Sequence, residues 1–172
     1  MPVPIGYEDG MFVMRSIEDA QPAKTIVLTE EHRRPFTLRA AQDSDRPFLY
    51  AFCYSEGMAN LDSLENVTVA VDVDDDPIGF IQIAYGASGV AHVYPIVVNP
   101  NWRGLHVGSA LIDEMHSRHG ELRLVSRGSS VGFYEKLGFQ ECDWSLIDDD
   151  CTEGCADCST KAECAPLPMR LI

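Results

Sequence analysis

Apolar and polar residues alternate along several short stretches of the chain, a pattern typical of half-buried β-strands. Phe36–Ala40 alternates in this way, and two β-branched runs at 67–73 and 78–85 flank an acidic turn, which predicts a β-hairpin. A further strand is predicted over Ala91–Val98, which contains Pro95. Because proline cannot donate a ladder hydrogen bond, this strand is expected at an edge, at a bulge or where pairing is interrupted.

Apolar residues three and four positions apart predict the helices. A first helix is expected to begin at a cap formed by Asp43 or Ser44, and a second, short one follows over 58–65. The segment 107–119 carries apolar residues on one face and basic residues in its last turn, where they complement the helix dipole. The remaining predicted elements are a strand over 122–126, a short helix between Ser129 and Gly138, and strands over 139–147 and 168–172.

The order of these elements, β-α-α-β-β-β-α-β-α-β-β, indicates the fold class. Strand 91–98, helix 107–119 and strand 122–126 form a βαβ unit, so the two strands are expected to be parallel with a right-handed crossover. The other strands follow one another through hairpins and are expected to be antiparallel. The sequence therefore predicts an α/β (α+β) protein with a mixed, mostly antiparallel central sheet flanked by helices.

Length and composition fit a single domain, and the apolar pattern bears on the cellular compartment that is expected. The chain has 172 residues, of which 45% are hydrophobic and 23% charged, as in ordinary globular proteins. The domain is predicted over 35–172, and 1–34 is an N-terminal extension with weak strand patterns at 11–15 and 25–28. No apolar run reaches the roughly 20 residues that span a bilayer, and no signal-peptide pattern opens the chain, so a cytoplasmic protein without a membrane partner is expected.

Charge and cysteine content bear on partners and metals. A formal net charge of −14 argues against nucleic-acid binding and attracts cationic substrates such as amines. An acidic, cysteine-rich insertion at about 148–165 holds Cys151, Cys155, Cys158 and Cys164. Four thiolates this close in sequence can surround one structural zinc ion, and a reduced loop without metal is the alternative. Disulfides are less expected in a reducing compartment.

The strand–loop–helix step around residues 97–111 is the main chemical signal. Backbone N–H groups at a helix start lack intrahelical partners and lie at the positive end of the dipole, which suits a pyrophosphate. Gly104 and Gly108 allow close approach of a ligand to the backbone, and Arg103 adds positive charge. Glycines that serve only packing at an ordinary helix start are the alternative.

Two motifs resemble the signatures of the GNAT superfamily of N-acetyltransferases. Arg103-Gly104-x-x-Val107-Gly108 is similar to the acetyl-CoA loop, written Q/R-x-x-G-x-G/A, and the preceding Ile96-Val97-Val98-Asn99-Pro100 is similar to the L-x-V-x-P strand beside pantetheine. The segment 126–139, which ends in FYEKLGF, resembles the second signature. The resemblance covers about four-fifths of the chain and leaves out the N-terminal extension and the cysteine-rich insertion. His106 departs from the usual glycine, so its side chain either crowds the pyrophosphate, points to solvent or helps to neutralise a phosphate.

The resemblance implies where acetyl-CoA binds and what reaction follows. Strands 91–98 and 122–126 should splay apart, with pantetheine in the gap, and a primary amine should attack the acetyl thioester directly in a ternary complex. The Val98 N–H would stabilise the developing oxyanion. The residues that the resemblance assigns to acetyl-CoA are Ile96, Val97, Val98, Arg103, Gly104, Leu105, His106, Val107, Gly108, Ser109, Arg127 and Tyr134.

Two residues are the catalytic candidates. Tyr134 matches the tyrosine of the family that protonates the departing thiolate, and a packing role is the alternative. His92 stands near the position where some members place a carboxylate base, and by strand periodicity it shares a face with Tyr94, Ile96 and Val98. The alternatives are a histidine held by hydrogen bonds in the sheet and one exposed to solvent, and a water chain could then serve as the base.

Other functions fit the same motifs. One alternative is a catalytically weak acyl-CoA-binding regulatory domain, and another is a metal-stabilised interaction module on a GNAT scaffold. The acceptor is expected to be a small-molecule or peptide amine. In the resembling family its specificity lies in segments that correspond to residues 52–64 and 84–90. The oligomeric state is open, a homodimer included.

Overall fold

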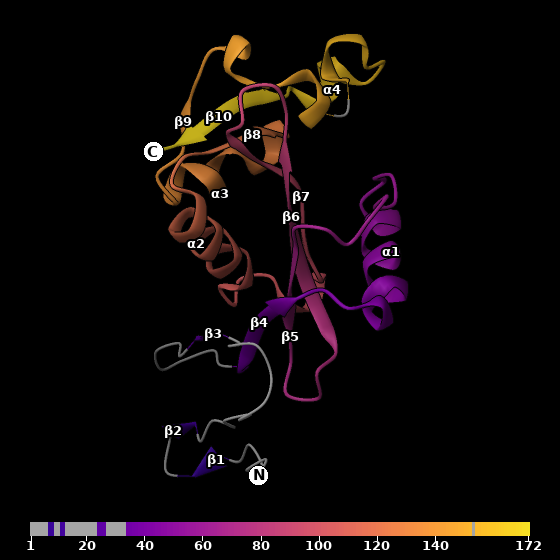
Figure 1. The fold of residues 1–172 in the computed structure, drawn as a ribbon, viewed down its shortest axis with the longest axis vertical. Coiled ribbons are helices and arrows are strands. Elements are labelled where there is room, and N and C mark those ends of the chain that lie inside the picture. The colour runs from indigo at the N-terminus through magenta and orange to yellow at the C-terminus, as the bar shows by residue number, and fades with distance from the viewer. Residues whose placement is uncertain (1–6, 9–10, 13–23, 27–33, 153) are drawn as a thin grey trace.

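The computed structural model describes residues 7–8, 11–12, 24–26, 34–152 and 154–172 of the chain. Its main sheet follows the strand order β3-β4-β5-β6-β7-β8-β10-β9 and is antiparallel except between β7 and β8 (Figure 1). A separate antiparallel pair, β1 and β2, precedes it. The strands are β1 (Tyr7–Glu8), β2 (Met11–Phe12), β3 (Lys24–Ile26), β4 (Phe36–Ala40), β5 (Val67–Val71), β6 (Pro77–Tyr85), β7 (Ala91–Val98), β8 (Leu122–Ser126), β9 (Gln140–Glu141) and β10 (Leu167–Leu171).

Helices cover both faces of this sheet (Figure 1). One face packs against α1 (Arg46–Ser55), and the other against α2 (Val107–His119) and the short α3 (Val131–Lys136). The last helix, α4 (Lys161–Cys164), lies in the cysteine-rich insertion. Short 3-10 helices are η1 (Asp43–Asp45), η2 (Pro100–Trp102), η3 (Gly128–Ser130), η4 (Trp144–Leu146), η5 (Asp149–Cys151) and η6 (Cys155–Asp157). The mixed sheet between helical layers confirms the predicted fold class.

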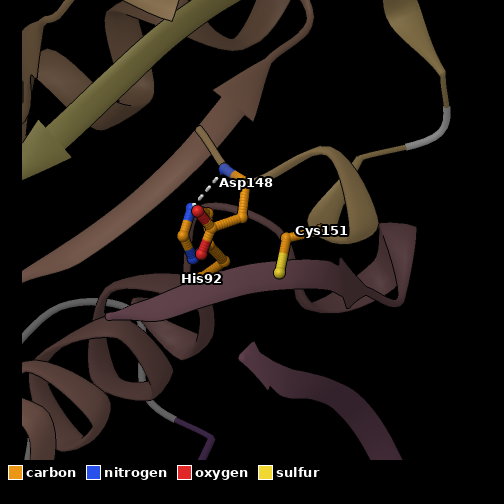
Figure 2. Close-up of side chains that lie close together, drawn as sticks. All are labelled: His92, Asp148 and Cys151. Carbon is orange, nitrogen blue, oxygen red and sulfur yellow. Dashed lines mark hydrogen bonds between the residues drawn. The ribbon is translucent and has the colours of Figure 1, made fainter. Parts of the chain in front are cut away.

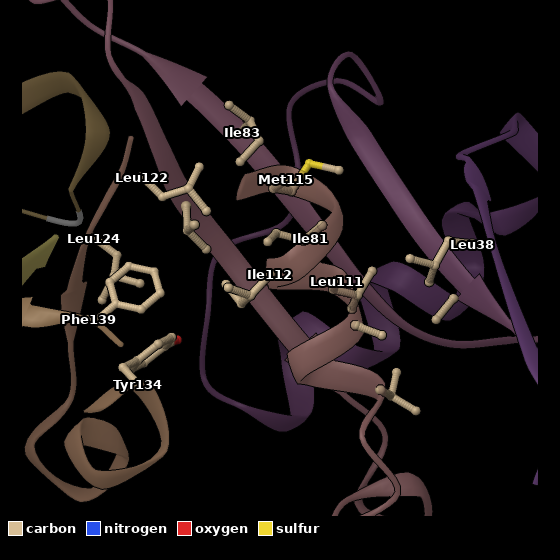
Figure 3. Packing of buried hydrophobic residues seen from close by; sticks show 14 of the residues in the cluster. Leu38, Ile81, Ile83, Leu111, Ile112, Met115, Leu122, Leu124, Tyr134 and Phe139 are labelled. Carbon is tan, nitrogen blue, oxygen red and sulfur yellow. The ribbon is translucent and has the colours of Figure 1, made fainter. Parts of the chain in front are cut away.

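Two apolar clusters, one on each face of the sheet, hold the helices in place. Ile81 and Ile83 of the sheet pack with Leu111 and Met115 of α2 (Figure 3). Val93 belongs to the same cluster. The opposite cluster joins Phe80 and Val97 to Leu49 and Phe52 of α1. Each fully buried side chain of this size stabilises the fold by about 1.5–3 kcal/mol relative to leaving it exposed. The central strands read as continuous apolar runs because they are covered on both sides.

A β-bulge interrupts the pairing of β6 with β7. Ile81 pairs with Ile96 and Ile83 pairs with Val93, so two residues of β7, Tyr94 and Pro95, oppose the single residue Gln82. The prediction of an interruption at Pro95 is therefore confirmed. The extra residue shifts the alternation of side chains, because each bulge inverts the face that follows.

The bulge overturns the prediction that one face carries both His92 and the end of β7. Val93 and Ile96 both contribute to the cluster under α2, which places His92 on the opposite face. The simple period of two holds only where the ladder is regular, and an inserted residue reverses it.

Two further predictions were wrong in part. Residues 58–65 form an irregular segment rather than a second helix, and within it Ser63 Oγ accepts the N–H of Glu65, a local bond that competes with helical pairing. The strand predicted over 139–147 is limited to Gln140–Glu141. The chain turns at Asp143, whose carboxylate accepts the Ser145 N–H at 2.8 Å and starts η4.

The parallel strands β7 and β8 diverge, as predicted. They pair at Ala91–Leu122 and His92–Arg123, and no further pair follows along their described length. On its other side β8 is paired with β10 along its whole length. The loss of pairing therefore concerns the contact between β7 and β8 and not the one between β8 and β10. The edge of β7 from Val93 to Val98 therefore faces β8 without a ladder. No helix in the described part of the chain is long and apolar enough to cross a membrane.

Candidate active site

The loop between β7 and α2 ends in an uncapped helix start. Asn99 turns the chain by accepting the Asn101 N–H at 2.9 Å, and Trp102 is buried beneath the loop. His106 is the N-cap residue of α2, in the left-handed conformation at φ +65°, and its side chain caps none of the described N–H groups. The first N–H groups of α2 therefore remain available at the positive end of the dipole, as an anion site requires.

Gly104 and His106, just before this helix, both have left-handed backbone conformations. Gly104 has φ +78° and open space around its would-be Cβ, so conformation rather than crowding favours glycine there. His106 adopts the same region with a side chain, at a cost of roughly 1–2 kcal/mol. Its side chain is exposed, so it does not fill the loop. Ser109 Oγ donates to the His106 carbonyl at 3.0 Å and holds this turn.

Arginines from both sequence motifs meet at the C-terminal end of α1. Arg103 donates from Nε to the Val98 carbonyl at 3.1 Å and pairs through Nη2 with the Glu56 carboxylate. Arg127 donates from Nη2 to the Glu56 backbone carbonyl at 3.1 Å. The two arginines are thus close to each other and to the end of β7. Glu56 was absent from the sequence predictions, because nothing in its local pattern marks a helix-end glutamate as a partner of residues 47 and 71 positions away.

Gly108 lies where α3 meets the first turn of α2. A Cβ on Gly108 would stand 3.0 Å from Phe133 Cζ and 3.7 Å from Val98 Cγ2. The glycine therefore avoids a close contact with Phe133, in agreement with the packing interpretation. This contact places α3, which carries Tyr134, beside the start of α2.

Tyr134 is buried, with 8% of its surface exposed, beside two other aromatic rings. Its ring makes edge-to-face contacts with Phe133 at a centroid distance of 5.0 Å and with Phe139 at 5.5 Å. Figure 3 shows the Tyr134 ring beside that of Phe139. The pKa of Tyr134 is raised to about 12, because the effect of burial exceeds the opposing effect of the nearby Arg127. The phenol is therefore protonated at neutral pH and able to donate a proton.

His92 is fully buried, and both of its ring nitrogens have hydrogen-bond partners. Nδ1 lies 2.9 Å from the Val90 carbonyl, and Nε2 lies 3.2 Å from the backbone N of Asp148. A donating Nδ1 and an accepting Nε2 describe a neutral imidazole held in the sheet. This geometry is the alternative given above for His92, and it leaves no nitrogen directed at the Val93–Val98 edge.

The four cysteines predicted to bind zinc do not come together. Among the described residues, no three of Cys151, Cys155, Cys158 and Cys164 bring their sulfurs within 4.8 Å of one another. Cys151 alone is buried, in η5, where burial first and then Asp148 and Asp150 raise the pKa of its thiol to about 11. The insertion folds as short turns that separate the thiols, which spacing alone did not reveal.

Comparison with known proteins shows a family to which part of the chain is similar. Residues 64–141, which hold both sequence motifs, match the family model described as "Acetyltransferase (GNAT) domain". Over these residues the chain is similar to the GNAT acetyltransferase family. Among curated proteins it is 34% identical over 84 residues to the peptidyl-lysine N-acetyltransferase YjaB of Escherichia coli (strain K12). That match covers 47% of this chain and 54% of YjaB, so the chain spans about half the length of this relative.

Solved structures share the fold at low sequence identity. Ard1 from Thermoplasma volcanium has a TM-score of 0.59 at 19% identity, and the match covers 80% of this chain and 97% of that one. Rv2747 from Mycobacterium tuberculosis, solved in complex with CoA and NLQ, has a TM-score of 0.64 at 16% identity, with coverages of 78% and 98%. These similarities confirm the GNAT fold.

Proposed function

We propose that the protein is an acetyl-CoA-dependent N-acetyltransferase that acts on primary amines. The observation that supports this most directly is the uncapped start of α2 beside the unpaired edge of β7. The helix α3, which carries Tyr134, packs on the same helix start through Phe133 and Gly108. The exposed N–H groups, Arg103 and Arg127 suit the phosphates of CoA. The backbone of Ile96 and Val98 suits the amides of pantetheine.

The groups around the loop have separate roles in acetyl transfer. A neutral amine attacks the thioester carbonyl carbon, the C–S bond breaks, and the amine nitrogen loses a proton. The Val98 N–H is our candidate donor to the carbonyl oxygen as charge develops. Tyr134 supplies the proton that the departing thiolate takes. Since both nitrogens of His92 are occupied, we assign removal of the amine proton to water rather than to this histidine.

The acceptor is proposed to be a cationic amine, such as a lysine side chain in a peptide. A groove of about 360 Å³ lies along β6 and the 62–66 turn. Its polar lining residues include Asp62, Ser63, Glu65, Asn66, Gln82 and Tyr94. These two carboxylates attract an ammonium group, and YjaB, described as acting on peptidyl lysine, supports the same class.

The proposed activity is tested by release of free CoA thiol from acetyl-CoA in the presence of a panel of amines. We expect turnover with lysine-containing peptides and small diamines, and little with the same peptides after the lysine amine is acetylated. Mass spectrometry of the peptide should show one added acetyl group. If CoA raises the melting temperature but no amine on the panel is acetylated, the chain is an acyl-CoA-binding regulatory domain instead.

Glu56 is expected to weaken CoA binding, because its carboxylate holds Arg103 in the free protein and repels a nearby phosphate. Replacing it in Glu56→Gln should tighten CoA binding about twofold to fivefold, the range of a partly exposed ion pair. Isothermal titration calorimetry measures the change, and Glu141→Gln, on the exposed strand β9, is the charge-matched control. Weaker binding in Glu56→Gln would show that the ion pair positions Arg103 for the phosphate rather than competing with it.

A further inference from the structure

Three potential metal ligands from distant parts of the sequence meet at the base of the cysteine-rich insertion. His92 comes from β7, and Asp148 and Cys151 come from the segment that forms η5 (Figure 2). A ring nitrogen, a carboxylate oxygen and the sulfur lie within 4.8 Å of one another. His92 and Cys151 are buried, with 0% and 4% of their surfaces exposed. The cluster takes no part in the acetyl-CoA site described above.

The neighbours of these side chains orient them as the outer shell of a metal site does. The Val90 carbonyl, 2.9 Å from His92 Nδ1, accepts the proton on that nitrogen and leaves the lone pair on Nε2. Asp148 Oδ2 accepts the N–H of Ser88 at 3.1 Å and its hydroxyl at 2.5 Å. These bonds hold the carboxylate through Oδ2, and Oδ1 takes no part in them. Nε2 accepts only the long 3.2 Å bond from the Asp148 N–H, which an ion can replace.

We propose that His92 Nε2, the Asp148 carboxylate and Cys151 Sγ bind one Zn²⁺ ion. A set of one imidazole, one carboxylate and one thiolate suits zinc, whereas magnesium and calcium select oxygen ligands. With bonds of roughly 2.0–2.3 Å, tetrahedral zinc needs ligand atoms about 3.3–3.6 Å apart. Movements of about an ångström, within the reach of side-chain rotation in η5, convert the observed spacing to this geometry. The fourth position falls to water.

The charge around the cluster favours a cation. Asp148 is followed by Asp149 and Asp150, and η5 lies against β6 and β7. A divalent ion would offset these carboxylates and join the insertion to the sheet through His92. Cys155, Cys158 and Cys164 are not part of this site.

Zinc titration of the reduced, chelator-treated full chain tests the proposal. One equivalent should bind, and Co²⁺ in its place should give the near-ultraviolet thiolate-to-cobalt absorption and the intense visible bands of a four-coordinate ion. Both signals should disappear in Cys151→Ser and in Asp148→Asn. Cys158→Ser, at an exposed thiol of the same insertion, is the matched control and should bind like the wild type.

A milder variant keeps the test decisive if Cys151→Ser fails to fold. Ser88→Ala changes an exposed residue whose hydroxyl donates to Asp148 and accepts the N–H of Val90, and it should lower zinc affinity about tenfold to 100-fold. Circular dichroism and CoA binding report whether each variant is folded. The absence of bound zinc in the wild type, or unchanged affinity in folded Cys151→Ser, would overturn the proposal. So would zinc binding that disappears in a Cys155, Cys158 and Cys164 triple serine variant.

Discussion

Replacing Tyr134 with phenylalanine is expected to lower kcat by about 10²- to 10⁴-fold, the usual contribution of a general acid. The substitution removes one oxygen from a ring that packs edge-to-face on Phe133 and Phe139, so the fold should be retained. The lost proton donation acts only in the transition state, and the decrease should therefore fall on kcat rather than on acetyl-CoA affinity. Steady-state kinetics with the best amine, together with calorimetry for acetyl-CoA, separates the two quantities.

Phe139→Leu is the matched control for this experiment. It perturbs the same aromatic cluster but leaves the Tyr134 hydroxyl in place. If Phe139→Leu lowers kcat as much as Tyr134→Phe does, the tyrosine contributes packing and not a proton. An unchanged kcat in Tyr134→Phe would mean that the thiolate leaves without help from this residue, as its pKa of about 12 makes the phenol a weak acid.

The elements set by local pattern were predictable with their boundaries. Phe36–Ala40, Ala91–Val98, Val107–His119 and Leu122–Ser126 were predicted as the structure has them. In these segments, regular periodicity, a following glycine or a clear polar break defines the ends, and tertiary contacts reinforce the same choice. The parallel pairing of β7 with β8 followed from the right-handed crossover rule alone.

The failures arose where a side chain or an inserted residue redirected the backbone. Ser63 accepts the Glu65 N–H within an irregular segment, and Asp143 accepts the Ser145 N–H where the chain leaves β9, local bonds that apolar periodicity does not report. The bulge opposite Gln82 moved His92 to the other face of the sheet. Pro95 predicted that an irregularity would occur, but it did not indicate which side chains would change face.

The candidate site divides in the same way. The loop from Arg103 to Ser109 and Tyr134 could be named from two motifs, because each motif is contiguous in the sequence. Glu56 and the cluster of His92 with Asp148 could not, since their partners are joined only by the packing of remote elements. Four cysteines at short spacing suggested one shared ion, whereas the turns of the insertion direct them apart.

The Gly108→Leu variant is expected to reduce CoA affinity by more than about 100-fold, or roughly 2.7 kcal/mol. A Cβ at this position would already stand 3.0 Å from Phe133 Cζ, and the rest of a leucine side chain would displace that ring or cover the first turn of α2. Either outcome obstructs the N–H groups that are proposed to bind the phosphates. Phe133 is partly exposed and can move, so the overpacking should cost about 1–3 kcal/mol of stability without unfolding the domain.

Variants of two other glycines show whether a loss of CoA affinity in Gly108→Leu comes from crowding at the start of α2, from backbone strain or from general destabilisation. Gly132→Leu places the same side chain in α3, where a Cβ meets nothing within 4 Å, and should leave CoA binding close to that of the wild type. Gly104→Ala adds a methyl group in open space but forces an ordinary residue to φ +78°, so any loss it causes reports loop conformation. Calorimetric titration with CoA, with thermal unfolding as the check on folding, compares all three variants. If Gly108→Leu binds CoA as Gly132→Leu does, the start of α2 is not the phosphate site, because no ligand held on those N–H groups could be indifferent to a leucine packed among them.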